Sequence, residues 1–203
     1  RSRATRRSAA TAPDTGRVGA ASPAGDSHPA LLAAFASVEI ASVRGVRTVP
    51  VAEFFTGVKR SVLEPDELIS AVLVTPPSGP QQFSKIGTRN AMVIAVSAFG
   101  FALHPATRTV GTGIGSAAPT PRPAPEAAAF LAGELEAAGL WDSRRPLPEN
   151  LAAEFGRRVR DAAAPIDDVR GSAAYRLHAL SVMARRTATW AWDAYRDENR
   201  SAA

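Results

Sequence analysis

The segment that most constrains the fold is residues 83–119, FSKIGTRNAMVIAVSAFGFALHPATRTVGTGIGSAAP, which carries two strand patterns joined by a short turn. The first pattern, Val93 to Leu103, is apolar on both faces, so both faces of that strand must be covered. The second pattern places Gly111, Gly113 and Gly115 on one face. A strand face without side chains lets another backbone approach closely. We therefore expect this second strand at an interior position in a domain that packs helices against a sheet.

Strand patterns come first along the chain and helical patterns come last. Residues 1–27 are poor in bulky apolar side chains and rich in small ones, which predicts a mostly disordered tail. Strands followed by helices predict an α+β domain with helices against an antiparallel sheet. In order, the expected elements are a helix at 28–35, a hairpin at 38–49, a helical turn at 51–55, a strand at 68–74, the two strands above, and helices at 126–138, 149–163 and 172–195, with a polar tail at 196–203.

Composition excludes several classes of site. The 203 residues suffice for one domain, or two small ones, with a buried core. The absence of cysteine excludes disulfides, thiolate metal sites and cysteine nucleophiles, and is compatible with a cytoplasmic protein. No apolar run reaches about 18 residues, so no membrane span is expected. The N-terminus has basic residues but no apolar secretory signal, and the sequence begins without Met, which suggests a fragment or a processed start.

The net charge of +5 raises the question of nucleic-acid binding. Most arginines are scattered among acidic residues, and the one basic cluster lies in the N-terminal tail, from Arg1 to Arg17. No aromatic side chains alternate with this cluster, as a platform for stacked bases would need. We therefore expect no nucleic-acid partner, while a small basic binding module that uses the tail stays open as an alternative.

Few side chains indicate catalysis or metal binding. The run Gly111–Ser116, GTGIGS, lies in a strand and not at a strand-to-helix turn, so it is not a dinucleotide-binding loop. The three histidines match no metal-ligand spacing. Asp167 and Asp168 could form an acid–base pair, but their place before a helix favours a loop or capping role. Ser97 and Ser116 have no neighbouring base that would activate them, so no catalytic residue is predicted.

Lys85 and Arg89 differ from these candidates, because they lie in an otherwise apolar neighbourhood directly before the buried strand. A cation there could meet a phosphate, a flavin or the carboxylate of a partner. A structural ion pair is the simpler alternative, and composition alone leaves both open.

Five segments in order carry a resemblance to a known family. They read SPAGDSHPALLA (Ser22–Ala33), SVRGVRTVPVAEFFTGVKRSVLEPDELI (Ser42–Ile69), FSKIGTRNAMVIAVS (Phe83–Ser97), GSAAPTPRPAPEAAAFL (Gly115–Leu131) and IDDVRGSAAYRLHAL (Ile166–Leu180). From about Val18 to Trp192, the chain resembles the C-terminal part of the FAD-binding medium subunit of molybdenum hydroxylases, the family of xanthine dehydrogenase and aerobic carbon monoxide dehydrogenase.

The resemblance implies two parts of a larger flavoprotein. Residues 28–79 would be the end of an α/β FAD-binding domain, whose N-terminal lobe would be missing. Residues 80–195 would be the C-terminal α+β domain, a three-stranded antiparallel sheet packed by helices.

In the family, two glycine-rich loops cradle the FAD pyrophosphate through backbone amides. The first loop would lie before Arg1. The second is expected between Thr5 and Ala20, where this sequence reads TRRSAATAPDTGRVGA instead. Such a departure is what a truncated or frame-disrupted gene product would show.

Four positions match cofactor contacts of the family: Ser22, Asp26, Ile69 and Lys85. The resemblance implies that Asp26 interacts with the cofactor, that Ile69 packs on the flavin, and that Lys85 approaches the isoalloxazine. A cation near the flavin favours its anionic reduced form and raises its potential.

The implied function is electron relay. In the family, electrons pass from a molybdopterin subunit through two [2Fe–2S] clusters on an iron–sulfur subunit to FAD, and then to an acceptor such as NAD⁺, oxygen or a quinone. The alternative is a non-catalytic remnant that keeps the fold and the subunit contacts but does not bind FAD by itself.

Overall fold

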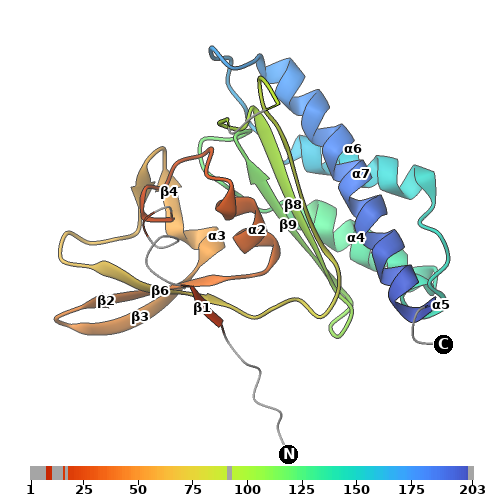
Figure 1. The fold of residues 1–203 in the computed structure, drawn as a ribbon, viewed down its shortest axis with the longest axis horizontal. Helices are drawn as coiled ribbons and strands as arrows, with labels where there is room; N and C mark the ends of the chain where they lie inside the picture. The colour runs from red at the N-terminus through yellow and green to blue at the C-terminus, as the bar shows by residue number, and fades with distance from the viewer. Residues whose placement is uncertain (1–7, 11–15, 17, 91–92, 201–203) are drawn as a thin grey trace, which may run out of the picture.

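The described residues form two larger antiparallel sheets, a two-stranded ribbon and a layer of helices (Figure 1). The structure, a computed structural model, describes residues 8–10, 16, 18–90 and 93–200. In the N-terminal part, a four-stranded sheet has the order β1-β6-β2-β3, and a two-stranded ribbon pairs β4 with β5. These elements are β1 (Ser8–Ala10), α2 (Ser27–Ala33), β2 (Ser37–Ser42), β3 (Gly45–Pro50), α3 (Val51–Phe54), β4 (Phe55–Gly57), β5 (Arg60–Ser61) and β6 (Leu68–Val74).

The C-terminal part is a three-stranded antiparallel sheet with helices on one face, as expected (Figure 1). Its strand order is β7-β8-β9, so β8 is the central strand and is buried along nearly its whole length. Helices α4, α6 and α7 cover one face, and α2 from the N-terminal part covers the other. The elements are β7 (Gln81–Ile86), β8 (Ser97–His104), β9 (Thr109–Gly115), α4 (Pro125–Ala137), α5 (Leu140–Ser143), α6 (Glu149–Asp161) and α7 (Ala173–Arg200).

One strand was missed and the start of another is wrong. The strand at 68–74 has the predicted bounds and pairs with β1 and β2 in the N-terminal sheet. The third strand of the C-terminal sheet is β7, whose sequence QQFSKI is mostly polar because this edge strand is only half buried. The central strand begins at Ser97 and not at Val93, because its pairing with β7 begins at Ser97 opposite Ile86 and Ile94 is exposed outside the ladder.

The glycine face of β9 does what its pattern predicts, since the backbone of α2 packs directly on it. A Cβ at Gly111 would collide with the Ala33 carbonyl, and one at Gly113 with the Pro29 carbonyl. The strand is buried between helices, yet it is an edge strand of its sheet. Its open edge is partly closed by a bridge between Ile114 and Arg122.

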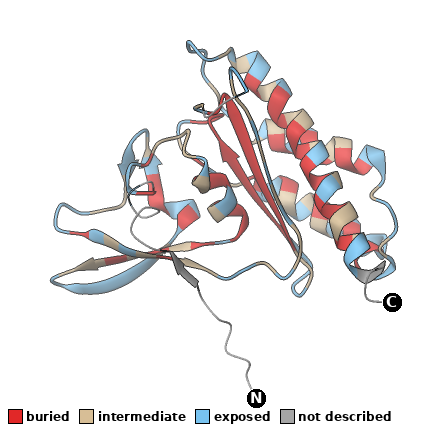
Figure 2. Cartoon of the chain, viewed as in Figure 1, coloured by how far each residue is buried: buried red, intermediate tan, exposed pale blue. Residues whose placement is uncertain are grey.

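Buried side chains form two clusters, one in each part (Figure 2). The larger lies between β8, β9 and the helices, where Phe99, Phe101 and Phe155 meet edge to face or tilted. The smaller lies under the N-terminal sheet and includes Val18, so the part of the expected tail that the structure describes at this point is folded.

The helices of the C-terminal part match their sequence patterns closely, except that α7 continues past Tyr195 to Arg200 into the expected polar tail. Among the described residues, no helix is both long and apolar enough to cross a membrane.

Candidate cofactor site

The centre of the site is an ion pair between the two parts of the chain. Lys85 Nζ lies 2.5 Å from Asp26 Oδ2 and donates a second hydrogen bond to the Val93 carbonyl at 3.3 Å. Lys85 is on β7, whereas Asp26 ends the loop that leads into α2. The lysine side chain is 29% exposed and the aspartate 44%, so both remain reachable from solvent.

The loop that carries Asp26 is a compact turn. The Gly25 N–H donates to the Ser22 carbonyl at 3.1 Å, and the Ala24 N–H donates to the Ser22 hydroxyl at 3.4 Å. A Cβ at Gly25 would collide with the ring of His28, which is fully buried with its centroid 4.7 Å from that of Phe55. The glycine therefore lets the loop lie flat on a buried ring.

Two distant segments hold the backbone of the loop. The Ser116 N–H donates to the Pro23 carbonyl at 2.8 Å, and the Lys59 N–H donates to the Ala21 carbonyl at 3.2 Å. Ser116 and Ala21 both have left-handed backbones, with φ of 60° and 44°. Because non-glycine residues rarely adopt this region, both conformations are held by their surroundings.

Ile69 lies on β6, where it pairs with Ile40 of β2. A Cβ at Gly19, on the segment that leads into the loop, would lie 3.4 Å from Ile69 Cδ1. The structure thus brings Lys85 and Asp26 into contact, places Ser22 in the same loop, and places Ile69 beside the segment before it.

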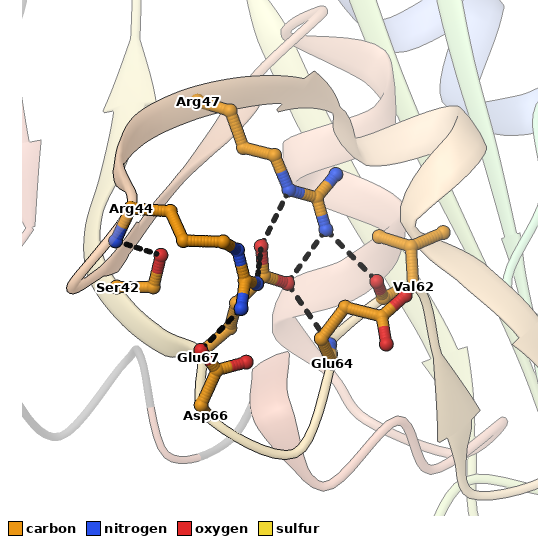
Figure 3. A network of polar contacts seen from close by, with 7 residues as sticks. All are labelled: Ser42, Arg44, Arg47, Val62, Glu64, Asp66 and Glu67. Atoms are coloured by element: carbon orange, nitrogen blue, oxygen red, sulfur yellow. Dashed lines mark hydrogen bonds and ion pairs between the residues drawn. The ribbon is translucent and has the colours of Figure 1, made fainter.

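A polar network fixes the chain just before Ile69 (Figure 3). Arg47 on β3 donates from Nε and Nη2 to the two oxygens of Glu67 at 2.8 and 2.7 Å, and the Glu64 N–H donates to Glu67 at 2.9 Å. The Glu67 side chain is only 5% exposed. The hydrogen bonds from Arg47 and then from Glu64 lower its pKa to about 2. Arg44, which pairs with Asp66, adds a further positive charge.

A cavity of roughly 340 Å³ opens beside the same loop. Ser22, Pro23 and Ala24 line one side, and Ser116 and Arg176 line another. Within the described residues, Ser116 Oγ and Arg176 Nε are buried without a hydrogen-bond partner. The wall of the cavity is mostly apolar, and these two polar atoms are buried in the residues that line it.

The IDDVRGSAAYR segment contributes Arg176, which no sequence pattern singled out. Arg176 on α7, 5% exposed, donates to the Ser116 carbonyl at 2.6 Å and to Asp168 at 2.5 Å. The Arg170 N–H and then Arg176 lower the pKa of Asp168. Asp167 accepts the Ala173 N–H at the start of α7, which is the capping role expected for this pair.

The remaining candidates stay outside the site. Gly111–Ser116 makes no strand-to-helix loop, because Gly111 to Gly115 lie in β9. The described residues contain no group of three or more side chains that could hold a metal ion. Burial lowers the pKa of His104, which bonds the Ala33 carbonyl through Nε2. Much of the stretch Thr5–Ala20, where a second glycine-rich loop was expected, lies outside the described residues, as do Arg1 to Arg7 of the basic tail.

Comparison with known protein families accounts for both parts of the chain. Residues 3–77 match the FAD binding domain in molybdopterin dehydrogenase, and residues 82–191 match the CO dehydrogenase flavoprotein C-terminal domain. The chain belongs to the family of FAD-binding medium subunits of molybdenum hydroxylases. The Lys85–Asp26 pair therefore joins two matched domains, one residue from each.

Solved structures share the fold. The Cu,Mo-CO dehydrogenase in its cyanide-inactivated form is 26% identical with a TM-score of 0.75, covering 88% of this chain and 60% of that one. Reconstituted CO dehydrogenase from Oligotropha carboxidovorans is 24% identical with a TM-score of 0.76, and the match covers 88% of this chain and 60% of that one. Quinoline 2-oxidoreductase from Pseudomonas putida 86 is 21% identical with a TM-score of 0.73, and the match covers 88% of this chain and 59% of that one. The chain thus spans about 60% of the length of these structures. A search of curated protein sequences found no match.

The residues present fit a flavin chemically. The pyrimidine edge of an isoalloxazine alternates carbonyl groups with N–H, so it needs both donors and acceptors. Asp26 supplies an acceptor beside the donor Lys85, and both are partly exposed. Asp26 and Lys85 suit only the flavin end of FAD. The described residues before Ser22 include no glycine-rich loop that could bind the phosphates.

Proposed function

We propose that this chain is part of a FAD-binding subunit that relays electrons from iron–sulfur clusters through FAD to an acceptor. The observation that carries the proposal is the contact between Lys85 and Asp26, the two charged positions at which the family resemblance implies cofactor contacts. These residues are 59 positions apart in the sequence, so their meeting is a property of the fold.

The four proposed contact residues have separate roles. Asp26 accepts hydrogen bonds from the flavin edge, and Lys85 donates to it and stabilises negative charge there. Ile69 supplies an apolar surface, and Ser22 closes the turn that carries Asp26. When bound, FAD supplies the redox chemistry, so the chain needs no general acid or base of its own.

The wider assignment follows from the same proposal. The partners are an iron–sulfur subunit with [2Fe–2S] clusters and a molybdopterin subunit, in a cytoplasmic complex without nucleic acid or membrane. Residues 28–79 act as the end of the FAD-binding domain and residues 80–195 as the C-terminal domain.

The test is FAD binding by the purified chain. We expect the visible flavin absorption band to stay with the protein through gel filtration after FAD is added, and Asp26→Asn to weaken retention. Glu53→Gln is the matched control, because Glu53 is an exposed acid on α3 and is not part of the loop. Equal retention by all three proteins would contradict the proposed role of Asp26.

The second candidate is a remnant that keeps the fold but does not bind FAD alone. It is favoured by the Thr5–Ala20 sequence, which lacks the expected second glycine-rich loop. A folded wild-type chain that retains no flavin would support this candidate. Retention restored by a longer subunit with a glycine-rich lobe would then show that the phosphate loops supply the missing affinity.

A further inference from the structure

The inference concerns Arg176, which lies in a motif that carries the family resemblance but belongs to none of the proposed cofactor contacts. We infer that Arg176 is a positioning residue that holds the Ser22–Asp26 loop in its flavin-contacting conformation through Ser116. This inference rests on the proposed function, because the loop carries two of the proposed flavin contacts.

Arg176 is a buried cation with two defined acceptors. Its Nη1 donates to the Ser116 carbonyl at 2.6 Å and its Nη2 to Asp168 Oδ1 at 2.5 Å. The arginine side chain is 6% exposed and the aspartate 26%. Burying a guanidinium is costly unless its hydrogen bonds are made, and an apolar side chain could fill the same space. The planar fork lets one side chain bind two acceptors in fixed directions.

The Ser116 peptide connects Arg176 to the loop. Its carbonyl accepts from Arg176, while its own N–H donates to the Pro23 carbonyl at 2.8 Å. The next carbonyl, of Ala117, accepts the Ala164 N–H at 2.9 Å. Ser116 has a left-handed backbone, with φ of 60°, which is unfavourable for serine. Arg176 therefore stabilises a strained residue whose orientation aims its N–H at Pro23.

The position of the loop follows from this contact. Pro23 is in the middle of the turn between Ser22 and Asp26, and the Ser116 N–H holds it from the side of the C-terminal sheet. At the end of the turn, Lys85 on β7 of the same sheet holds Asp26. Without the Arg176 contact, Ser116 is freer to leave its left-handed conformation, and the turn loses one of its two anchors on the C-terminal part.

The test compares Arg176→Met and Arg176→Lys with Arg170→Gln in the full chain. Arg170 is the matched control, because it also lies beside Asp168 and lines the same cavity, but no hydrogen bond joins its side chain to Ser116. Hydrogen exchange at the Ser116 amide and FAD affinity are both measured. Amides within β8 report whether any effect is global.

We expect Arg176→Met to raise the exchange rate of the Ser116 amide roughly tenfold and to weaken FAD binding roughly tenfold. A tenfold change corresponds to about 1.4 kcal/mol, the size expected for a lost charge-assisted hydrogen bond. Arg176→Lys, which retains the charge without the fork, should give a smaller effect of the same kind. Arg170→Gln should change neither quantity more than about twofold. Exchange in β8 should stay at the wild-type rate.

Unchanged Ser116 exchange in both Arg176 variants would overturn the inference, as would a uniform rise that includes β8. If Arg176→Met does not fold, Arg176→Lys decides by the same criteria. A wild-type chain that binds no FAD would overturn the proposed function instead, and the exchange measurement would still decide whether Arg176 holds the loop.

Discussion

At the scale of single residues, the charge of Lys85 has a consequence for redox potential. An ammonium group beside a flavin stabilises the negative charge gained on reduction. Lys85→Met should therefore lower the two-electron potential of bound FAD by roughly 30 mV, the equivalent of about 1.4 kcal/mol. A redox titration of the FAD-loaded subunit measures the shift. Lys59→Met changes the chain's only other lysine, on the loop between β4 and β5, and should leave the potential unchanged.

A second residue-scale prediction concerns Glu67 and acid stability. Its pKa is about 2 in the folded chain against an ordinary value of 4.5, so its charged form stabilises the fold above about pH 4.5. This contribution is lost as the pH falls through 4.5 toward 2. Glu67→Gln should lower the melting temperature at neutral pH and flatten its dependence on pH in this acid range.

Thermal melts across the acid range provide the comparison. Glu53→Gln removes an exposed acid and should leave the steep acid limb of the wild-type curve in place. If Glu67→Gln and the wild type lose stability in parallel below pH 4.5, the Arg47–Glu67 contact is not the cause of the acid dependence.

Sequence reasoning found Asp26 and Lys85 because each lies in a short segment that resembles the family, SPAGD and SKIGTR. Their ion pair is the structural alternative left open for Lys85, while contact with a flavin stays a prediction for both residues. Arg176 was missed for a physical reason. A cation in a helical pattern is usually exposed, and nothing local in the sequence shows that this one is buried against Ser116.

At the scale of elements, the docking of α2 on β9 depends on missing side chains. Gly113→Ala would place a Cβ against the Pro29 carbonyl, and backbone cannot move aside as a flexible side chain can. We expect a loss of about 1–3 kcal/mol in the free energy of unfolding, the usual cost of overpacking. Chemical denaturation measures it.

Gly133→Ala in α4 is the matched control for this substitution. No atom of the described residues lies within 4 Å of a Cβ at Gly133, and the residue is exposed inside a helix. Alanine there should stabilise the chain by about 0.5–1 kcal/mol. A destabilisation of similar size in both variants would show that the close approach of α2 is not what requires glycine in β9.

Elements whose apolar residues recur at a regular spacing were predictable from the sequence. Elements that depend on pairing with a distant strand were not. The helices 126–138 and 149–163 are close to α4 and α6, because their apolar residues recur at helical spacing. Strand β7 alternates only weakly, and its pairing with β8 comes from tertiary contact. The apolar run from Val93 to Val96 matched a strand pattern, yet its first residue uses its carbonyl to bind Lys85 outside the sheet.

At the scale of the whole molecule, α2 ties the two parts of the chain together. It follows the loop that carries Asp26, packs on β8 and β9, and contributes Leu32 to the N-terminal cluster. One helix therefore completes the cover of the C-terminal sheet while positioning the proposed cofactor loop. The boundary near residue 80 divides the sequence into two matched domains, but the packing crosses it.

A fragment that begins at residue 80 tests this coupling. It retains β7, β8, β9 and the C-terminal helices but loses α2, whose buried residues include Pro29, Leu32 and Ala33. Since each large side chain that is buried contributes about 1.5–3 kcal/mol, the fragment should melt well below the full chain and bind an apolar dye on its uncovered glycine face. Adding a peptide of residues 22–36 should displace the dye and raise the melting temperature, whereas the same peptide with Pro29→Asp, at the residue that lies against Gly113 and Gly115, should do neither. A fragment as stable as the full chain, without dye binding, would mean that the C-terminal sheet needs no cover from α2 and that the two parts fold independently.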